Sequence, residues 1–263
     1  MTGGGTVGKA LDVLDRVAGF GRPVRFSEVL AQSDFPKPTL YRLLQTLTNQ
    51  DMLVYDPDRQ TYSPGIRLLR LAHAAWEQST LALIARPHID ALSAAVGETV
   101  HLAQLDHAQV IYIDKRNANN PVQMFSQAGK VGPAYCTGVG KVMLAFADPA
   151  RIDAVIAQQS FHRFTSTTLT DSRSLRAELT AIRARGYGFD REEHEPGIIC
   201  IAMPIRTDTG RVLGAISVTS TTGRTDLAGL ESYVPILSDT AAAIAKDARN
   251  WSFPEHIGAP MGS

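Results

Sequence analysis

The chain has 263 residues, and its 26 basic side chains balance its 26 acidic ones. With 44% hydrophobic and 20% charged residues, the composition is that of a globular protein and excludes a wholly disordered or collagen-like chain. No apolar run reaches the ~18 residues that a membrane-spanning helix needs, and two cysteines cannot form a disulfide framework. The first residues lack the pattern of a secretory signal, so we expect a cytoplasmic protein of two domains.

The first 64 residues predict three helices and a β-hairpin. Apolar spacing and helix-breaking residues place the helices at residues 7–18, 27–32 and 39–50. Two short strands follow at residues 52–55 and 61–64, joined by a turn that contains proline. This order is the plan of a winged helix-turn-helix domain. We therefore expect a DNA-binding domain over residues 1–64.

Residues 65–79 predict a linker helix with an apolar stripe. The stripe consists of Leu68, Leu69, Leu71, Ala72, Ala75 and Trp76. Such a stripe is too apolar to remain exposed on a monomer. We therefore expect two copies of the chain to pair through this helix.

Residues 80–252 predict an antiparallel sheet flanked by helices. Strands are expected at residues 99–105, 109–113, 122–125, 198–206 and 212–220. Helices are expected at residues 81–96, 137–147, 149–158, 172–185 and 227–251. This combination predicts an α+β sensor-like domain. The last residues, 253–263, predict a disordered tail.

Four stretches of the sequence resemble the IclR-type bacterial transcription regulators. They are Phe35–Leu47, Gly132–Phe146, Arg185–Ile205 and Gly214–Ser220. The resemblance covers nearly the whole chain, and the third stretch is its most specific part. It implies a winged helix, a dimerising linker helix and a C-terminal GAF-like domain that binds an effector. It also implies a homodimer or a dimer of dimers. Because two-fold symmetric dimers read palindromic sites, we expect a palindromic double-stranded DNA operator.

The third predicted helix has a polar outer face suited to DNA. Short polar and cationic side chains on one helix face can reach base edges and phosphates. The residues on this face are Thr39, Tyr41, Arg42 and Gln45. We also expect backbone contacts from Arg22 and Arg25, and minor-groove contacts from Arg59 and Gln60 at the tip of the wing. Pro38 departs from the serine that the resemblance implies, which puts a phosphate contact there in doubt.

A second set of residues suits a small ligand. Residues 137–140 place glycines and free amides at a helix start, which favours an anion, and two hydroxyl residues alternate on the last strand. By resemblance, the effector contacts fall on Gly138, Val139, Asp190, Cys200, Ser217 and Thr219. We expect a small polar effector, such as an organic or sugar acid, because these positions offer donors and little aromatic surface.

The resulting hypothesis is a ligand-responsive regulator, a repressor of a catabolic operon, with no cofactor, metal or enzymatic activity. One alternative is a redox sensor that uses Cys136 and Cys200, which requires accessible thiols of low pKa. Catalysis by these thiols would need a histidine as general base, and no spacing between a cysteine and a histidine in the sequence indicates such a pair. Zinc binding through His194 and Cys200 also lacks a known ligand spacing.

Overall fold

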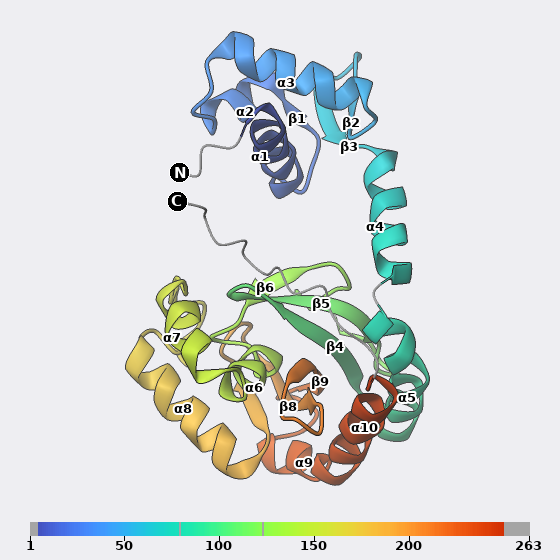
Figure 1. The fold of residues 1–263 in the computed structure, drawn as a ribbon, viewed down its shortest axis with the longest axis vertical. Coiled ribbons are helices and arrows are strands. Elements are labelled where there is room, and N and C mark those ends of the chain that lie inside the picture. Colours follow the sequence, from blue (N-terminus) through green and yellow to red (C-terminus); the bar gives the residue numbers. More distant parts are fainter. Residues whose placement is uncertain (1–4, 79, 123, 250–263) are drawn as a thin grey trace. The chain divides into compact units, whose positions relative to one another are not determined.

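The computed structural model describes residues 5–78, 80–122 and 124–249, and the chain divides into two compact units on either side of residue 79 (Figure 1). Each unit has its own hydrophobic core. The predicted tail at 253–263 lies outside the described residues. Within the described parts, no helix is long and apolar enough to cross a membrane.

The first unit combines helices with a small antiparallel sheet of order β1-β3-β2. Its elements are α1 (Thr6–Gly19), β1 (Val24–Arg25), α2 (Phe26–Ala31), α3 (Lys37–Asn49), β2 (Leu53–Asp56), β3 (Thr61–Pro64) and α4 (Ile66–Gln78). The helices form as the apolar spacing predicts, and Leu40, Leu44 and Val13 are fully buried between them. The winged helix-turn-helix prediction is confirmed.

The second unit contains one antiparallel sheet with helices on both faces (Figure 1). The strands, in the order β6-β5-β4-β9-β8-β7, are β4 (Thr99–Asp106), β5 (Gln109–Arg116), β6 (Val131–Pro133), β7 (Gly188–Arg191), β8 (Ile198–Arg206) and β9 (Val212–Thr221). The helices are α5 (Thr80–Val96), α6 (Gly138–Ala145), α7 (Pro149–Ala157), α8 (Ser172–Arg185), α9 (Leu227–Glu231) and α10 (Val234–Asp247). The α+β class is confirmed.

The two faces of this sheet carry different side chains. Large apolar residues such as Leu102, Ile201 and Ile216 pack in the core shared with α5 and α10. The opposite face carries small residues, among them Ala202 and Ala215, in the core shared with α6 and α8. Strand residues alternate between the two faces of the sheet. The same strands therefore place large side chains in the core on one face and small side chains on the other, which leaves space beneath α6.

Two predicted elements of this unit differ from the structure, and one observed strand was not predicted. The strand expected at residues 122–125 does not form at 122, 124 or 125, and residue 123 lies outside the description. Instead, β6 pairs with β5. The short edge strand β7 was not predicted. The single helix expected over residues 227–251 is divided into α9 and α10, because Pro235 lacks an N–H and occupies the first turn of a new helix.

Candidate functional site

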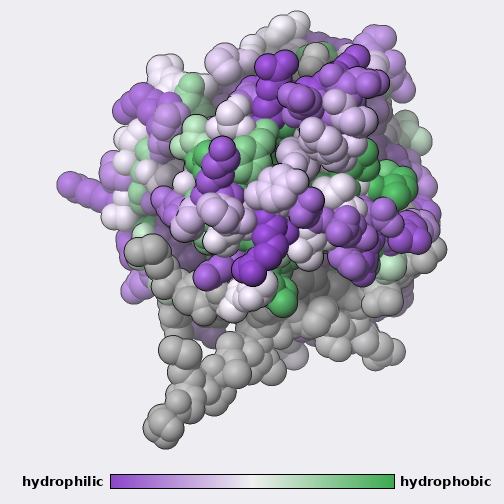
Figure 2. All heavy atoms as spheres, turned by 90° about the horizontal axis from the view of Figure 1, so that it is seen from above, coloured by the Kyte–Doolittle hydropathy of each residue, from purple (hydrophilic) through white to green (hydrophobic). Residues whose placement is uncertain are grey.

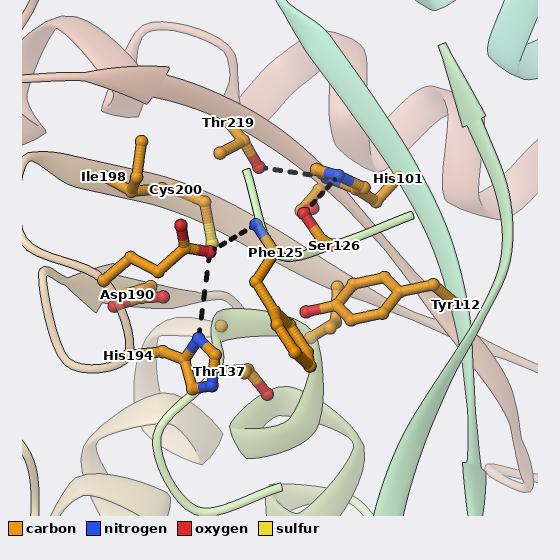
Figure 3. Close-up of a pocket in the computed structure, with 14 residues that line it drawn as sticks. His101, Tyr112, Phe125, Ser126, Thr137, Asp190, His194, Ile198, Cys200 and Thr219 are labelled. Atoms are coloured by element: carbon orange, nitrogen blue, oxygen red, sulfur yellow. Dashed lines mark hydrogen bonds and ion pairs between the residues drawn. The ribbon is translucent and has the colours of Figure 1, made fainter. Parts of the chain in front are cut away.

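One cavity lies beneath the start of α6, between this helix and the small-residue face of the sheet (Figure 3). Its volume is about 30 Å³, room for one or two water molecules. It is lined by His101, Tyr112, Phe125, Ser126, Thr137, Gly138, Val139, Asp190, His194, Glu195, Ile198, Cys200, Ser217 and Thr219. All six residues expected at the effector site therefore lie around one cavity.

The close approach of α6 to the sheet depends on two glycines. A Cβ atom on Gly138 would collide with Sγ of Cys200 on β8. A Cβ atom on Gly140 would collide with the backbone of Ala134. Glycine at both positions lets the helix start directly over the strands.

The first turn of α6 presents backbone amides that no side chain caps. Thr137 precedes the helix, but its side chain makes no capping hydrogen bond. The Thr137 hydroxyl donates instead to the carbonyl oxygen of Pro133, at 2.8 Å. Uncapped N–H groups and the positive end of the helix dipole favour an anion at this end of the cavity.

His101 links two sides of the cavity through hydrogen bonds. Its Nδ1 lies 3.2 Å from the Thr219 hydroxyl, and its Nε2 lies 2.8 Å from the Ser126 hydroxyl. Burial, followed by repulsion from Lys115, lowers the pKa of His101 to about 3. The imidazole is therefore neutral at physiological pH and offers the hydroxyls one donor and one acceptor.

Aromatic side chains form another wall of the cavity. The Tyr112 ring lies 5.4 Å from the His101 ring, and its hydroxyl points into the cavity (Figure 3). Tyr112 is buried, and no group among the described residues hydrogen-bonds to its hydroxyl. Phe125 and His194 lie with their rings 4.9 Å apart. The expectation of little aromatic surface was wrong, because it considered only the motif stretches and not β5 or the β5–β6 connection.

The β5–β6 connection covers part of the cavity. The backbone N–H of Phe125 donates to Oε1 of Glu195, at 2.8 Å. The next residue, Ser126, makes the bond to His101 described above. These contacts explain why the strand expected at 122–125 is absent: Phe125 bonds to a side chain of the cavity rather than to a neighbouring strand.

Asp190 adds a carboxyl group to the cavity wall from β7. It lies opposite Cys200 of β8 in the strand register. Its Oδ1 accepts a hydrogen bond of 2.7 Å from the backbone N–H of Glu193. Burial raises the pKa of Asp190 to about 7, and repulsion from the Glu193 carboxylate adds to the shift while Lys141 opposes it. A buried carboxyl of this kind changes its charge near neutral pH.

Several lining residues were not predicted from the sequence. They are His101, Tyr112, Phe125, Ser126, His194, Glu195 and Ile198. His101 faces Ser217 across the β4–β9 pair, so the strand register brings it to the cavity. That register could be inferred only from the pairing of strands more than a hundred residues apart.

Neither cysteine has the environment of a redox-sensing thiol. Cys136 and Cys200 are both buried. Burial, with repulsion from Asp190, raises the pKa of each thiol. The redox alternative therefore lacks the accessible thiol of low pKa that it requires. No group of three or more metal-ligating side chains is close enough to hold a metal ion in the described parts of the chain.

The outer face of α3 is exposed as expected. Tyr41, Arg42 and Gln45 are exposed, while Thr39 is partly buried. Gln45 donates a hydrogen bond to the Tyr41 hydroxyl, at 3.1 Å. Among the described residues, no carboxylate pairs with the Arg42 guanidinium. Figure 2 looks onto this end of the first unit, where hydrophilic side chains predominate around smaller hydrophobic patches. The face has a free cation available for a phosphate or a base.

The other expected DNA contacts are exposed, but two of them have partners. Arg22 pairs with Glu28 at 2.6 Å, and Arg59 lies 4.0 Å from Asp56. Arg25 and Gln60 are also exposed. Surface pairs of this kind are weak, so a phosphate can compete for either guanidinium.

Two family models match the chain in the order of its two units. "IclR helix-turn-helix domain" matches residues 6–57, and "Bacterial transcriptional regulator IclR C-terminal" matches residues 73–246. The chain belongs to the IclR family. Two curated relatives come from Escherichia coli (strain K12). The transcriptional regulator KdgR is 30% identical over 233 residues, which is 89% of each chain. The DNA-binding transcriptional repressor YiaJ is 31% identical over 215 residues, covering 80% of this chain and 76% of YiaJ.

A solved structure shows the same architecture. The IclR transcriptional regulator from Alicyclobacillus acidocaldarius superposes with a TM-score of 0.78 at 25% identity, covering 92% of this chain and 98% of that chain. This IclR-family protein is therefore a ligand-responsive, DNA-binding transcriptional regulator and not an enzyme.

Proposed function

We propose that this regulator is a repressor whose operator binding is controlled by a small carboxylate held in the cavity beneath α6. The convergence of the six expected residues on one buried cavity is the observation that carries the proposal. The proposed effector contacts are Gly138, Val139, Asp190, Cys200, Ser217 and Thr219. The repressor assignment is supported by the likeness to YiaJ, a DNA-binding transcriptional repressor.

The chemistry of the cavity supports a carboxylate as effector. The uncapped first turn of α6 supplies N–H donors and a positive dipole end. Ser217 and Tyr112 supply hydroxyl groups without hydrogen-bond partners among the described residues. A volume of about 30 Å³ favours a short acid, and a larger acid requires movement of side chains that line the cavity. A sugar acid would require a larger movement of these side chains than a two- or three-carbon acid.

The proposed DNA contacts follow from exposure and charge. Thr39, Tyr41, Arg42 and Gln45 of α3 read the major groove. Arg22 and Arg25 hold the backbone before α2, and Arg59 and Gln60 reach the minor groove from the wing. The free guanidinium of Arg42 makes this residue the most informative to change.

Arg42→Ala is the direct test of the reading helix. We expect it to weaken binding to the DNA upstream of the regulator's own gene by ~1–3 kcal/mol if Arg42 contacts a base, and to weaken binding to all sequences alike if it contacts a phosphate. Gel-shift titration against operator and scrambled DNA separates the two cases. Lys246→Ala, an exposed cation of the second unit, is the matched control. Unchanged operator affinity in Arg42→Ala removes this residue from the DNA contacts.

A homodimer fits both the proposed operator and the surface of α4. Leu69 and Leu71 are 66% and 51% exposed on this helix, and palindromic sites are read by two-fold symmetric proteins. The side chains of Ala75 and Trp76 lie outside the described residues. We infer a dimer through α4 and a dimer of dimers through the second units. Sedimentation of a stable monomer at micromolar concentration contradicts both.

The remaining assignments follow from the proposed role. A regulator that binds operator DNA acts in the cytoplasm. We place the DNA-binding domain at residues 1–64, the linker helix at 65–79 and the effector domain at 80–252. The two compact units divided at residue 79 support the last of these boundaries.

A further inference from the structure

Three ionisable side chains are buried together beside the cavity. Lys141 of α6 is 0% exposed, Glu193 is 2% exposed and Asp190 is 7% exposed. Lys141 and Glu193 form an ion pair, and the backbone N–H of Glu193 donates to Asp190. The single buried ammonium is therefore balanced by Glu193. Asp190 has no cation of its own in this cluster.

The other groups around Asp190 do not supply the missing positive charge. The thiols of Cys136 and Cys200, from the α6 entrance and β8, stay neutral because burial raises the pKa of each. The phenol of Tyr112 on β5 also stays neutral, since burial raises its pKa. None of these three groups carries a positive charge that could balance an ionised Asp190.

The basic side chains nearby already have partners. His194, in the turn after β7, lies 3.8 Å from Oε1 of Glu195. Next to Asp190, Arg191 pairs with Glu178 of α8 at 3.1 Å. Lys141 also attracts the Glu178 carboxylate and helps to lower its pKa. Lys141 and His194 attract an ionised Asp190, but burial and repulsion from Glu193 outweigh them. An ionised Asp190 therefore has no ion-pair partner of its own, and its buried charge is costly.

A carboxylate effector increases this imbalance. Two carboxylates that share a small buried site cannot both remain ionised, and they hold one proton between them. In the protonated form, one oxygen of Asp190 still accepts from the Glu193 N–H, while its O–H can donate to the effector. The buried charges then sum to a single negative charge, which the uncapped start of α6 faces.

We propose that each carboxylate effector enters the cavity together with one proton, which Asp190 carries, and that the site therefore selects monoanions over dianions. The inference rests on the proposed function, because it requires a carboxylate effector in this cavity. The proton comes from solvent and is released when the effector leaves. A dianion of similar size brings a second charge for which the cavity has no partner.

The proposal fixes the pH dependence of effector binding. Below pH 7 the free protein already holds the proton, so monoanion affinity is independent of pH. Above pH 7 the free protein loses the proton, and the fall in affinity approaches about tenfold for each pH unit until the pKa of Asp190 in the complex is reached. A site that binds the carboxylate with Asp190 ionised shows neither effect.

Calorimetry of the full-length protein tests the proposal. Acetate, glycolate and lactate are titrated as monoanions and malonate as the dianion, at pH 6.5, 7.5 and 8.5, in phosphate and in Tris. The heat difference between the two buffers gives the number of protons taken up. For the tightest monoanion, we expect uptake close to one proton at pH 8.5, a roughly eightfold loss of affinity from pH 7.5 to 8.5, and weaker binding of malonate.

Two variants sharpen the result. In Asp190→Asn, whose side chain is neutral at every pH, we expect proton uptake to vanish and affinity to become independent of pH. Asp114→Asn, which changes a buried carboxyl away from the cavity, retains wild-type uptake. If a variant fails to fold, the proton uptake and pH dependence of the wild-type protein still test the proposal.

The calorimetry distinguishes failure of this inference from failure of the proposed function. Binding of a monoanion without proton uptake and without pH dependence overturns this inference and leaves the proposed function in place. If none of the acids binds to the wild-type protein, the carboxylate effector is overturned, and this inference with it.

Discussion

The DNA-binding face and the effector cavity use polar side chains in opposite ways. On α3, the proposed contacts come from one helix, are largely exposed and make few bonds to one another. In the cavity, polar groups from four strands, one helix and two connecting segments are mostly buried, and several bond to one another. A change on α3 should therefore affect DNA binding alone. A change around the cavity should affect stability as well as ligand binding.

The largest expected difference concerns the ion pairs of the two regions. Lys141→Met removes the cation that faces the buried carboxyls of Glu193 and Asp190. We expect it to destabilise the second unit by ~3–5 kcal/mol, because it leaves a buried charge unpaired. Urea unfolding, followed by a probe in the second unit, measures the loss.

Arg22→Met is the matched control in the first unit. The Arg22–Glu28 pair is solvent-exposed, with side chains 57% and 34% exposed. We expect no measurable change in unfolding, because water and salt screen such a pair. Equal losses for the two variants would contradict the distinction between the two regions.

A smaller effect is expected when one tyrosine of each region is replaced by phenylalanine. Tyr112→Phe removes a hydroxyl that points into the cavity, and we expect it to weaken acid binding by ~0.5–1.5 kcal/mol, the value of one hydrogen bond. Operator affinity without acid should not change. Tyr41→Phe removes an exposed hydroxyl of α3 and should affect only operator affinity. Calorimetry and gel shift on both variants form a two-by-two comparison, and a crossed result would show that the two sites are wrongly assigned.

The first unit could be predicted almost completely from the sequence, because its signals are local. Apolar spacing, Pro38 and the turn at residues 56–60 specify three helices and a hairpin without reference to distant residues. Even there, α2 begins at Phe26, one residue before the predicted start at Ser27. Such a shift at a helix end leaves the packing unchanged.

The cavity could be predicted only in part, because the position of many of its lining residues depends on the register of strand pairing. Gly138, Ser217 and Thr219 lie in recognisable stretches, and alternation on β9 places the two hydroxyls on one face. His101 and Tyr112 carry no local signal, since the β4–β5 and β4–β9 pairings decide which face they occupy. A bulge between Leu102 and Ala103 also shifts the β4–β5 register, and residue alternation alone does not reveal it.

The most direct test of the account measures the coupling between its two regions. Operator affinity is determined by fluorescence anisotropy over a series of concentrations of the tightest-binding monocarboxylate, for the wild-type protein and for Ser217→Ala. We expect saturating acid to weaken wild-type operator binding by ~5- to 150-fold. In Ser217→Ala the half-maximal effect should require ~3- to 10-fold more acid, because one hydrogen bond to the effector is lost. If both proteins respond at the same acid concentration, or if the acid leaves operator affinity unchanged, the cavity does not control DNA binding.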